Sequence, residues 1–236
     1  MRAALLTIGN EVVSGDILNT NARWLSQRLE SLGVHVVIAA AVPDEIALVA
    51  EFVNRERERV DFLIVTGGLG GTPDDLTREA LAAAFGVGQL SVPDLADELR
   101  RRFPKHPDYA ARWAQLPVGS RPLRNPKGGA PGFVIANVWV MPGLPAEMEA
   151  MFDAYADELR GETPISTWRR VFRTRESDIV HLLASATVRW PAVSIGSYPR
   201  FTPDGPEVEV VLKSPDAKAV AAAAAWIEPE LVAVSA

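Results

Sequence analysis

Two aspartates that follow four glycines make the most chemically informative segment of this 236-residue chain. The segment runs from Thr66 to Thr77, with glycines at positions 67, 68, 70 and 71 and aspartates at 74 and 75. Glycine lets a backbone approach a ligand closely, and the free N–H groups where a helix begins attract anions. Two carboxylates repel a phosphate unless a divalent cation bridges them to it, as Mg²⁺ commonly does. The segment therefore predicts a phosphate-bearing ligand bound together with a divalent metal ion, with Mg, Mn and Co as candidates.

The residues expected to bind the phosphate are Thr66, Gly67, Gly68, Leu69, Gly70 and Thr72, and those expected to hold the metal are Asp74 and Asp75. Ordinary helix architecture offers an alternative for part of this segment. Thr72 is a good N-cap, Pro73 fits the first helical position, and Asp75 falls where a capping-box acid would lie. This alternative explains one aspartate by helix capping, but it explains a pair behind four glycines less easily.

The elements around this segment predict an α/β fold. Strand-like apolar runs at 3–8, 34–42 and 62–65 alternate with helical patterns, and this order predicts a mostly parallel sheet with helices on both faces. Ligands of such sheets bind at the carboxyl ends of the strands. The loops 9–19, 42–44 and 67–75 should therefore open on one edge of the sheet.

Polar residues in the other loops are further candidates. In the first loop the expected ligand-binding residues are Gly9, Asn10, Glu11, Ser14 and Asn21, although the asparagines and the serine could instead cap the first helix. Asp44 follows Pro43 and precedes the second helix, and this position alone favours a role as the N-cap of that helix. Lys127 and Gly128, in a loop rich in glycine and proline, are expected to contact phosphate. The basic run 100–102 is more typical of a solvated helix face.

The last third of the chain predicts a separate small unit. Residues 161–166 look like a linker, and the order after them is strand 168–172, helix 177–188, strands 193–198 and 208–212, and helix 217–227. That order is typical of a compact α+β subdomain. We expect one domain over residues 1–162 and the subdomain over 163–236, with the subdomain covering a cleft or building a homo-oligomer.

Composition excludes several classes of protein. The net charge of −6 and the pI of about 5.2 argue against a nucleic-acid-binding protein. The absence of cysteine excludes disulfides, thiolate zinc sites and cysteine nucleophiles. No window has the 18 or so apolar residues of a membrane span, and the first residues are too short an apolar run for a signal peptide. We expect a cytoplasmic protein without a membrane partner.

Four segments in chain order carry a resemblance to a known family. They are Gly9-Asn10-Glu11 with Ser14-Gly15 and Asn19-Thr20-Asn21, then Val42-Pro43-Asp44, then Thr66 to Thr77, and then Asn125 to Phe133 with Pro142 to Met148. Together they resemble the MoaB/Mog molybdopterin-binding-like domains, in the type found at the N-terminus of CinA (competence/damage-inducible) proteins. The tail, with Gly196 to Pro199 and Glu207 to Leu212, is similar to the tail subdomain of this group, including that of some FAD synthases. The resemblance covers nearly the whole chain.

The resemblance implies a three-layer α/β/α domain with a site over the glycine loop. Relatives bind molybdopterin, transfer or remove adenylyl groups, or hydrolyse nucleotide pyrophosphates with a divalent metal. The paired aspartates of the family fall on Asp44 and Asp75, so the resemblance makes these two the candidate catalytic residues, in place of the capping role that position alone favours for Asp44. Gly71 departs from the pattern, because the family usually has proline there. The 236 residues hold no C-terminal amidohydrolase domain of the CinA kind, so its deamidase activity is not expected of them.

The expected function is a metal-dependent pyrophosphatase acting on an ADP-ribose- or FAD-like ligand. In this mechanism the loop amides hold a phosphate, Asp75 holds the cation with Asp74 or Asp44, and a metal-bound water attacks the phosphorus. The alternative is a module that binds molybdopterin or a nucleotide without turnover. A role as an assembly or regulatory partner is a third hypothesis.

Overall fold

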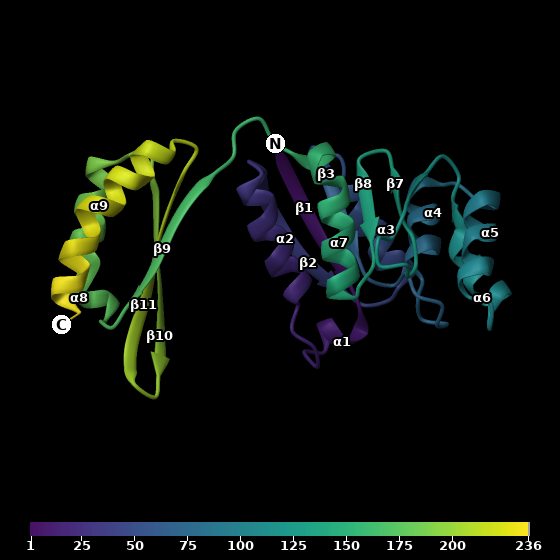
Figure 1. Cartoon of the computed structure of the whole chain (residues 1–236), viewed down its shortest axis with the longest axis horizontal. Coiled ribbons are helices and arrows are strands. Elements are labelled where there is room, and N and C mark those ends of the chain that lie inside the picture. Colours follow the sequence, from purple (N-terminus) through teal and green to yellow (C-terminus); the bar gives the residue numbers. More distant parts are fainter. Residues whose placement is uncertain (236) are drawn as a thin grey trace. The chain divides into compact units, whose positions relative to one another are not determined.

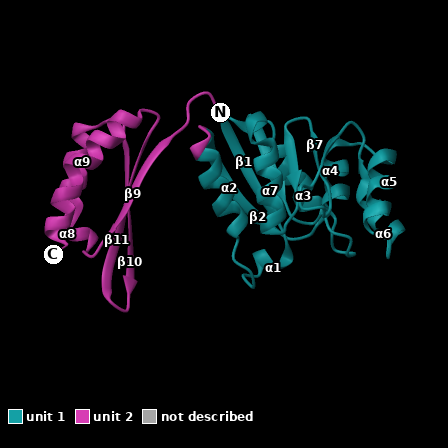
Figure 2. Cartoon of the chain, in the orientation of Figure 1, with its two compact units in different colours: residues 1–30, 34–160 teal, residues 31–33, 161–236 magenta. Residues whose placement is uncertain are grey.

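The computed structural model describes residues 1–235, which form two compact units. Unit 1 consists of residues 1–30 and 34–160, and unit 2 consists of residues 31–33 and the segment from 161 onward (Figure 2). The division at 160/161 lies beside the expected linker at 161–166. No helix in the described part of the chain is both long and apolar enough to cross a membrane.

Unit 1 is built on a six-stranded sheet with the order β2-β1-β3-β8-β7-β6. Four neighbouring strands are parallel, and the last two are antiparallel to their neighbours. The parallel strands are β1 (Arg2–Ile8), β2 (His35–Val42), β3 (Phe62–Thr66) and β8 (Val138–Met141), and the others are β7 (Gly132–Ile135) and β6 (Arg121–Leu123). Every residue of β3 is buried, as expected for a central strand covered on both faces. The predicted α/β fold with a mostly parallel sheet is confirmed.

Helices cover both faces of this sheet, so unit 1 has three layers (Figure 1). One layer holds α3 (Ile46–Glu56) and α4 (Thr77–Phe85), whose Val53 and Leu81 share a core with Leu6 and Val65 of the strands. The opposite layer holds α2 (Thr20–Ser31) and α7 (Pro145–Tyr155). An edge-to-face contact of Trp24 with Phe152, with ring centroids 5.4 Å apart, joins these two helices.

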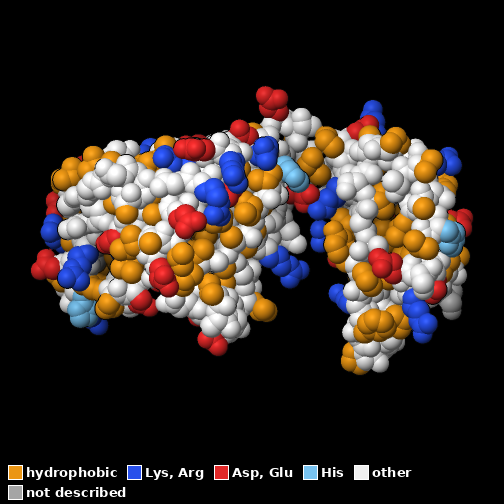
Figure 3. All heavy atoms as spheres, turned by 180° about the vertical axis from the view of Figure 1, so that it is seen from behind, with side chains coloured by type: hydrophobic (Ala, Val, Ile, Leu, Met, Phe, Trp, Pro, Cys, Tyr) orange, Lys and Arg blue, Asp and Glu red, His pale blue; other side chains and the backbone are white. Residues whose placement is uncertain are grey.

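Short elements complete unit 1 around the sheet. The remaining helices are α1 (Asn10–Val13), α5 (Pro93–Arg102) and α6 (Pro107–Ala111), with 3₁₀ turns at Arg112–Ala114 and Ala156–Leu159, and a two-stranded ladder pairs β4 (Gln89–Ser91) with β5 (Gln115–Pro117). On the surface of unit 1 that faces the reader in Figure 3, acidic and basic side chains are interspersed.

Unit 2 is an antiparallel sheet with two helices on one face. The order β10-β11-β9 joins β10 (Ser194–Thr202), β11 (Gly205–Ser214) and β9 (Ser166–Phe172), and the helices are α8 (Glu176–Arg189) and α9 (Ala217–Val234). The core of the unit lies between Val208, Val210 and Leu212 of β11 and residues such as Ile179 and Ile227 of the helices. The predicted β-α-β-β-α order is found.

Helix α9 differs from its prediction at one end. The expected helix ended at residue 227, before Pro229, but α9 continues through this proline to Val234. Proline in a helix loses one N–H bond and crowds the preceding turn. Leu231 is fully buried beyond it, and we attribute the continuation of the helix to this burial.

Candidate functional site

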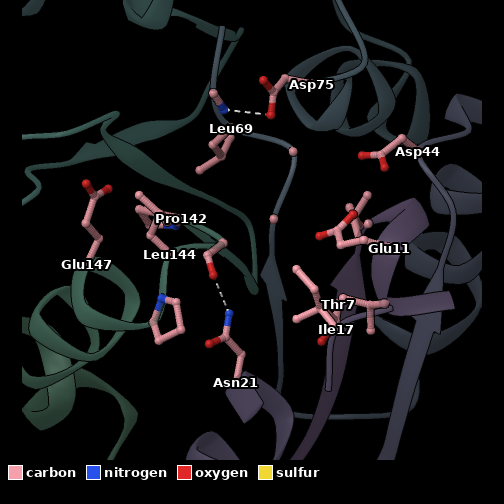
Figure 4. Close-up of a pocket in the computed structure, with 18 of the residues that line it drawn as sticks. Thr7, Glu11, Ile17, Asn21, Asp44, Leu69, Asp75, Pro142, Leu144 and Glu147 are labelled. Carbon is pink, nitrogen blue, oxygen red and sulfur yellow. Dashed lines mark hydrogen bonds between the residues drawn. The ribbon is translucent and has the colours of Figure 1, made fainter. Parts of the chain in front are cut away.

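The loops at the carboxyl ends of the strands in unit 1 surround one cleft of about 500 Å³ (Figure 4). Each of four parallel strands contributes residues from the loop that follows it, as the topology of such sheets requires. The expected site residues that line the cleft are Gly9, Glu11, Asn21, Asp44, Gly67, Gly68, Leu69, Gly70, Asp74 and Asp75. Segments as far apart in the chain as residues 9 and 75 are therefore neighbours.

Four consecutive carbonyl groups of the glycine loop are anchored to the start of α4. Thr77 Oγ1 donates to Gly67 O at 2.8 Å, and Thr77 N donates to Gly68 O at 3.2 Å. The guanidinium of Arg78 donates to Leu69 O and to Gly70 O, each at 2.8 Å. Residues 77 and 78 thus fix the orientation of the four peptide groups that join residues 67 to 71.

Glycine is required at two positions of this loop. Gly67 has a φ of +103°, and a Cβ at this position would lie 2.1 Å from the carbonyl oxygen of Ile8. A Cβ on Gly70 would lie 2.5 Å from Asp75 Oδ2. A side chain at either position would move the strand end or the carboxylate, so the close approach depends on glycine.

Asp75 does not cap helix α4, although it accepts the Thr72 N–H as a capping-box acid would. Helix α4 begins at Thr77 with Leu76 as N-cap, so Thr72 and Pro73 lie in the loop before it and not at its first positions. The Asp75 carboxylate folds back over the loop, where Oδ1 accepts the N–H of Gly70 at 2.9 Å and Oδ2 accepts the N–H of Thr72 at 2.8 Å. The Thr72 hydroxyl donates to Oδ2 as well. The Asp75 carboxylate thus holds the loop closed by accepting two backbone N–H groups and one hydroxyl.

The capping explanation of Asp44 is wrong too. The N-cap of α3 is Glu45, and Asp44 Oδ2 instead accepts the N–H of Asn10 at 2.9 Å. Burial raises the pKa of Asp44, the bond from Asn10 opposes this, and the nearby carboxylates of Glu11, Asp74 and Asp75 raise the pKa further. Asp44 Oδ1 also lies 3.4 Å from the position that a Cβ on Gly68 would take. Asp44 therefore faces the glycine loop across the cleft (Figure 4).

Acidic side chains dominate the charge of the cleft. Five carboxylates line it, and none of the described lining residues is lysine, arginine or histidine. The five are Glu11, Asp44, Asp74, Asp75 and Glu147. Hydrogen bonds within its own turn, first from Thr72, lower the pKa of the exposed Asp74. A phosphate entering this cleft would meet negative side chains and backbone amides.

Oxygen donors of this kind suit hard divalent cations such as Mg²⁺ and Mn²⁺. The residues near the glycine loop that offer them are Asp44, Asp74 and Asp75. Within residues 1–235, however, no three acidic or histidine side chains already converge closely enough to hold a metal ion. The donor chemistry therefore fits a divalent cation, and a ligand phosphate or a side-chain rotation has to complete its coordination.

Six expected site residues do not line the cleft: Asn10, Ser14, Thr66, Thr72, Lys127 and Gly128. Asn10 and Thr72 act indirectly, since they hydrogen-bond the lining residues Asp44 and Asp75. The Ser14 hydroxyl is hydrogen-bonded to Asp16 within its own turn. Thr66 is buried at the end of β3. A Cβ on Gly128 would meet the Arg102 guanidinium, so this part of the loop packs against α5.

Several lining residues had not been proposed from the sequence. The most important are Glu147 and Leu144, which come from the segment after β8. Arg78, which does not line the cleft but anchors the loop from behind, had not been proposed either. The sequence of residues 133–141 predicts a strand hairpin, but no local pattern indicates that β8 lies beside β3. Once this pairing is known, residues 142–147 are expected at the cleft, because they follow the carboxyl end of a parallel strand.

Comparison with known proteins identifies the family. Residues 4–161 match the model described as "Probable molybdopterin binding domain". The chain belongs to this molybdopterin-binding domain family. Residues 169–235 match a second model, described as the middle domain of FAD synthase. The resemblance seen in the sequence motifs is confirmed, and membership of the molybdopterin-binding domain family implies a small-molecule ligand.

Relatives of this molybdopterin-binding domain protein include CinA-like proteins. A CinA-like protein of Frankia casuarinae is 41% identical over 208 residues, which are 80% of this chain and 48% of that relative. The chain thus spans about half the length of that relative. A protein of Archaeoglobus fulgidus is 36% identical over 203 residues, covering 85% of this chain and 86% of the relative. The solved structure of the protein CinA from Thermoplasma acidophilum has a TM-score of 0.63 at 30% identity, covering 67% of this chain and 97% of that one.

Proposed function

We propose that this member of the molybdopterin-binding domain family hydrolyses the pyrophosphate bond of a nucleotide ligand, such as an ADP-ribose- or FAD-like molecule, with the help of a divalent cation. The observation that carries the proposal is the presence, in one cleft, of an anchored row of peptide amides and of several carboxylates. The amides suit phosphate, and the carboxylates suit a cation.

The amide row follows from the anchored carbonyls. In a trans peptide the C=O of one residue and the N–H of the next point in opposite directions. Because the carbonyls of residues 67–70 point toward Thr77 and Arg78, the N–H groups of residues 68–71 point away from α4. Successive N–H groups on one side of a turn form an anion-binding concavity. The Asp75 carboxylate, which accepts the Gly70 N–H, supports the idea that this row attracts an oxyanion.

The carboxylates explain why a cation is needed. Asp74 and Asp75 would hold it, and their negative charges lie close enough to Asp44 to add, after burial and together with Glu11, to the rise in its pKa. A divalent cation bound here would neutralise phosphate charge and make a nearby water more acidic.

The residues of the chain then have separate roles. Amides of the loop hold one phosphate and stabilise the negative charge that grows on its non-bridging oxygens. Asp44 takes a proton from a water molecule whose oxygen forms a bond to phosphorus. The bond from that phosphorus to the bridging oxygen breaks, which releases two phosphate monoesters. A raised pKa makes Asp44 a stronger base than an ordinary aspartate.

A second candidate function is binding without turnover. The observation that favours it is that, among the described residues, no three metal-binding side chains converge. A protein that only carries a pterin or a nucleotide needs the amide row and not a completed metal site.

Release of AMP separates the two functions. The purified protein is incubated with ADP-ribose and with FAD, in the presence of Mg²⁺, Mn²⁺ or Co²⁺ and in the presence of a chelator. We expect cation-dependent AMP release by the wild type, loss of release in Asp44→Asn, and unchanged release in Asp157→Asn, a control on an exposed acid away from the cleft. Binding without AMP release would favour the carrier, and the absence of binding to ADP-ribose, to FAD and to a free pterin would refute both.

A further inference from the structure

A tyrosine of helix α6 packs on the glycine loop from outside the cleft. A Cβ added to Gly71 would lie 2.2 Å from Tyr109 Oη, 2.3 Å from its Cζ and 2.6 Å from its Cε2. The edge of the Tyr109 ring thus occupies the space that a side chain at position 71 would need. Neither residue lines the cleft, so any effect of Tyr109 on a ligand has to act through the loop.

The position of Tyr109 is fixed by the core of unit 1 and by two further rings. Its ring lies edge-on to Trp113 with centroids 5.7 Å apart, and Trp113 lies edge-on to Phe103 with centroids 5.2 Å apart. The next two residues of α6, Ala110 and Ala111, are buried in the core. Tyr109 itself is 43% exposed. Its ring therefore stands at the surface on a helix that the core holds in place, and it gives the loop a fixed support.

The Tyr109 ring, and not the backbone conformation, explains the glycine at position 71. The φ angle of Gly71 lies outside the left-handed region, unlike the φ angles of Gly67 and Gly68. The left-handed backbone that favours glycine is therefore not the reason for glycine here. What excludes a side chain is the close approach of the ring to the loop.

This contact lies at the last peptide group of the amide row. The oxygen of that peptide, Gly70 O, accepts a hydrogen bond from Arg78 at 2.8 Å. Burial lowers the pKa of Arg78, and Tyr109 is near enough to be among the groups that oppose this. The peptide group is thus held at its oxygen by Arg78 and at the Gly71 Cα by Tyr109.

From this geometry we propose that Tyr109 is a positioning residue, which packs on Gly71 and so fixes the end of the amide row in the orientation that a phosphate needs. This inference rests on the proposed function, since the row is taken to bind phosphate. Fixing the backbone of one residue during binding corresponds to roughly five- to thirtyfold in affinity. Because Tyr109 fixes Gly71 before the ligand arrives, its removal should weaken phosphate binding by about tenfold.

Pyrophosphate binding with Mn²⁺, measured by calorimetry, tests the role of Tyr109. We expect Tyr109→Ala to bind about tenfold more weakly than the wild type. Tyr109→Phe should bind as the wild type does, because Cζ and Cε2 keep the contact with the loop. The matched control, Tyr198→Ala, removes a tyrosine that is 56% exposed and also packs on a glycine, Gly196, but lies in unit 2. Unchanged binding by Tyr109→Ala, or equal weakening by Tyr109→Phe or by the control, would overturn the proposal.

A substitution at Gly71 tests the contact from the other side. Gly71→Ala keeps Tyr109 but places a methyl group where the ring lies, so the ring has to move. We expect the same weakening of pyrophosphate binding as in Tyr109→Ala. In the double variant, Gly71→Ala should have no further effect, because the ring that it displaces has gone. Additive weakening, or none in Gly71→Ala alone, would contradict the proposal, since the two residues would then act independently.

Hydrogen exchange without ligand separates this inference from the proposed function. We expect peptides that contain residues 70–72 to exchange faster in Tyr109→Ala and in Gly71→Ala than in the wild type and in Tyr109→Phe. If these two variants exchange faster but the wild type binds no pyrophosphate, the proposed function fails and the support of the loop by Tyr109 stands. If the wild type binds pyrophosphate and both variants match it in exchange and affinity, this inference alone fails.

Discussion

Replacing Arg78 by methionine should disorder the glycine loop while the rest of unit 1 keeps its fold. Arg78 is 6% exposed, and its guanidinium holds Leu69 O and Gly70 O. Methionine has a similar length and fills the apolar part of the space, but it donates no hydrogen bond. Both carbonyls would be released, and the peptide groups behind them would be free to rotate.

The magnitude follows from the two bonds. A hydrogen bond that involves a charged group contributes about 1.5–3 kcal/mol, so two contribute about 3–6 kcal/mol. Burial lowers the pKa of Arg78, so desolvation of the guanidinium offsets part of this gain. We therefore expect the free energy that keeps the loop closed to fall by about 2–4 kcal/mol.

Hydrogen exchange measured by mass spectrometry resolves this change. The wild type, Arg78→Met, Arg78→Lys and the control Arg59→Met are compared through peptides that cover residues 67–77. The control removes an exposed arginine in the turn after α3, whose contact with Glu56 is long, at 3.8 Å. Arg78→Met should exchange much faster in the loop, and Arg78→Lys should be intermediate, since an ammonium lacks the guanidinium fork.

Two results would refute this reasoning. One is unchanged exchange in the loop of Arg78→Met, which would show that Thr77 alone holds the loop. The other is equal acceleration throughout unit 1, which would show that Arg78 supports the fold in general. Pyrophosphate binding should fall together with loop protection, because both depend on the orientation of the same peptide groups.

The remaining predictions concern the acids, a glycine and the tail. Asp75→Asn should abolish cation-dependent AMP release and lower stability by about 1–2 kcal/mol, since an amide oxygen replaces only one of two accepting oxygens; full turnover would show that Asp75 only shapes the loop. The raised pKa of Asp44 means that protonation of this carboxyl stabilises the folded protein, and this stability is lost as the pH rises through that pKa. Above that pKa, Asp44→Asn should be more stable than the wild type. Thermal unfolding without metal, from acidic to neutral pH, would contradict this by showing a variant less stable than the wild type. Gly67→Ala should reduce pyrophosphate binding strongly, because its Cβ meets a strand carbonyl; calorimetry with unchanged affinity would contradict the strained backbone. A fragment of residues 1–160 should bind pyrophosphate with Mn²⁺ as the full chain does, because every lining residue lies within it; lost binding by a folded fragment would assign part of the site to unit 2.

Local patterns predicted the sheet well because its strands are continuous apolar runs separated by glycine and polar loops. They also placed Asp44, the first loop and the glycine loop on one edge, since topology alone requires this of parallel strands. The structure brings these three loops together in one cleft.

The same patterns failed where hydrogen bonds beyond the first helical turn determined the structure. Thr72, Pro73 and Asp75 have the spacing of a helix start, but Arg78 and Thr77 reach back to the loop carbonyls and Asp75 takes the loop amides. Asp44 is bound by Asn10, 34 residues earlier, and not by its own helix. Capping rules consider only neighbours within a few residues, so they could not weigh these competing hydrogen bonds.

The pairing of β8 with β3 was invisible for a different reason. The sequence of residues 133–141 is compatible with a hairpin at many positions in a sheet, since alternation reports which face is buried and not which strand lies alongside. The contribution of Leu144 and Glu147 to the cleft depends on this pairing. Local sequence patterns therefore gave no reason to place Leu144 and Glu147 at the cleft.

The anchored row of peptide amides also affects how ligand preference can change in evolution. A side-chain substitution cannot delete a backbone N–H, except by proline, so the amide row can persist while many of its neighbours change. Ile17, Leu18 and Leu144 line the cleft and are exposed, so they can be replaced with little loss of stability. We therefore expect ligand preference to change through such side chains while the amide row is kept.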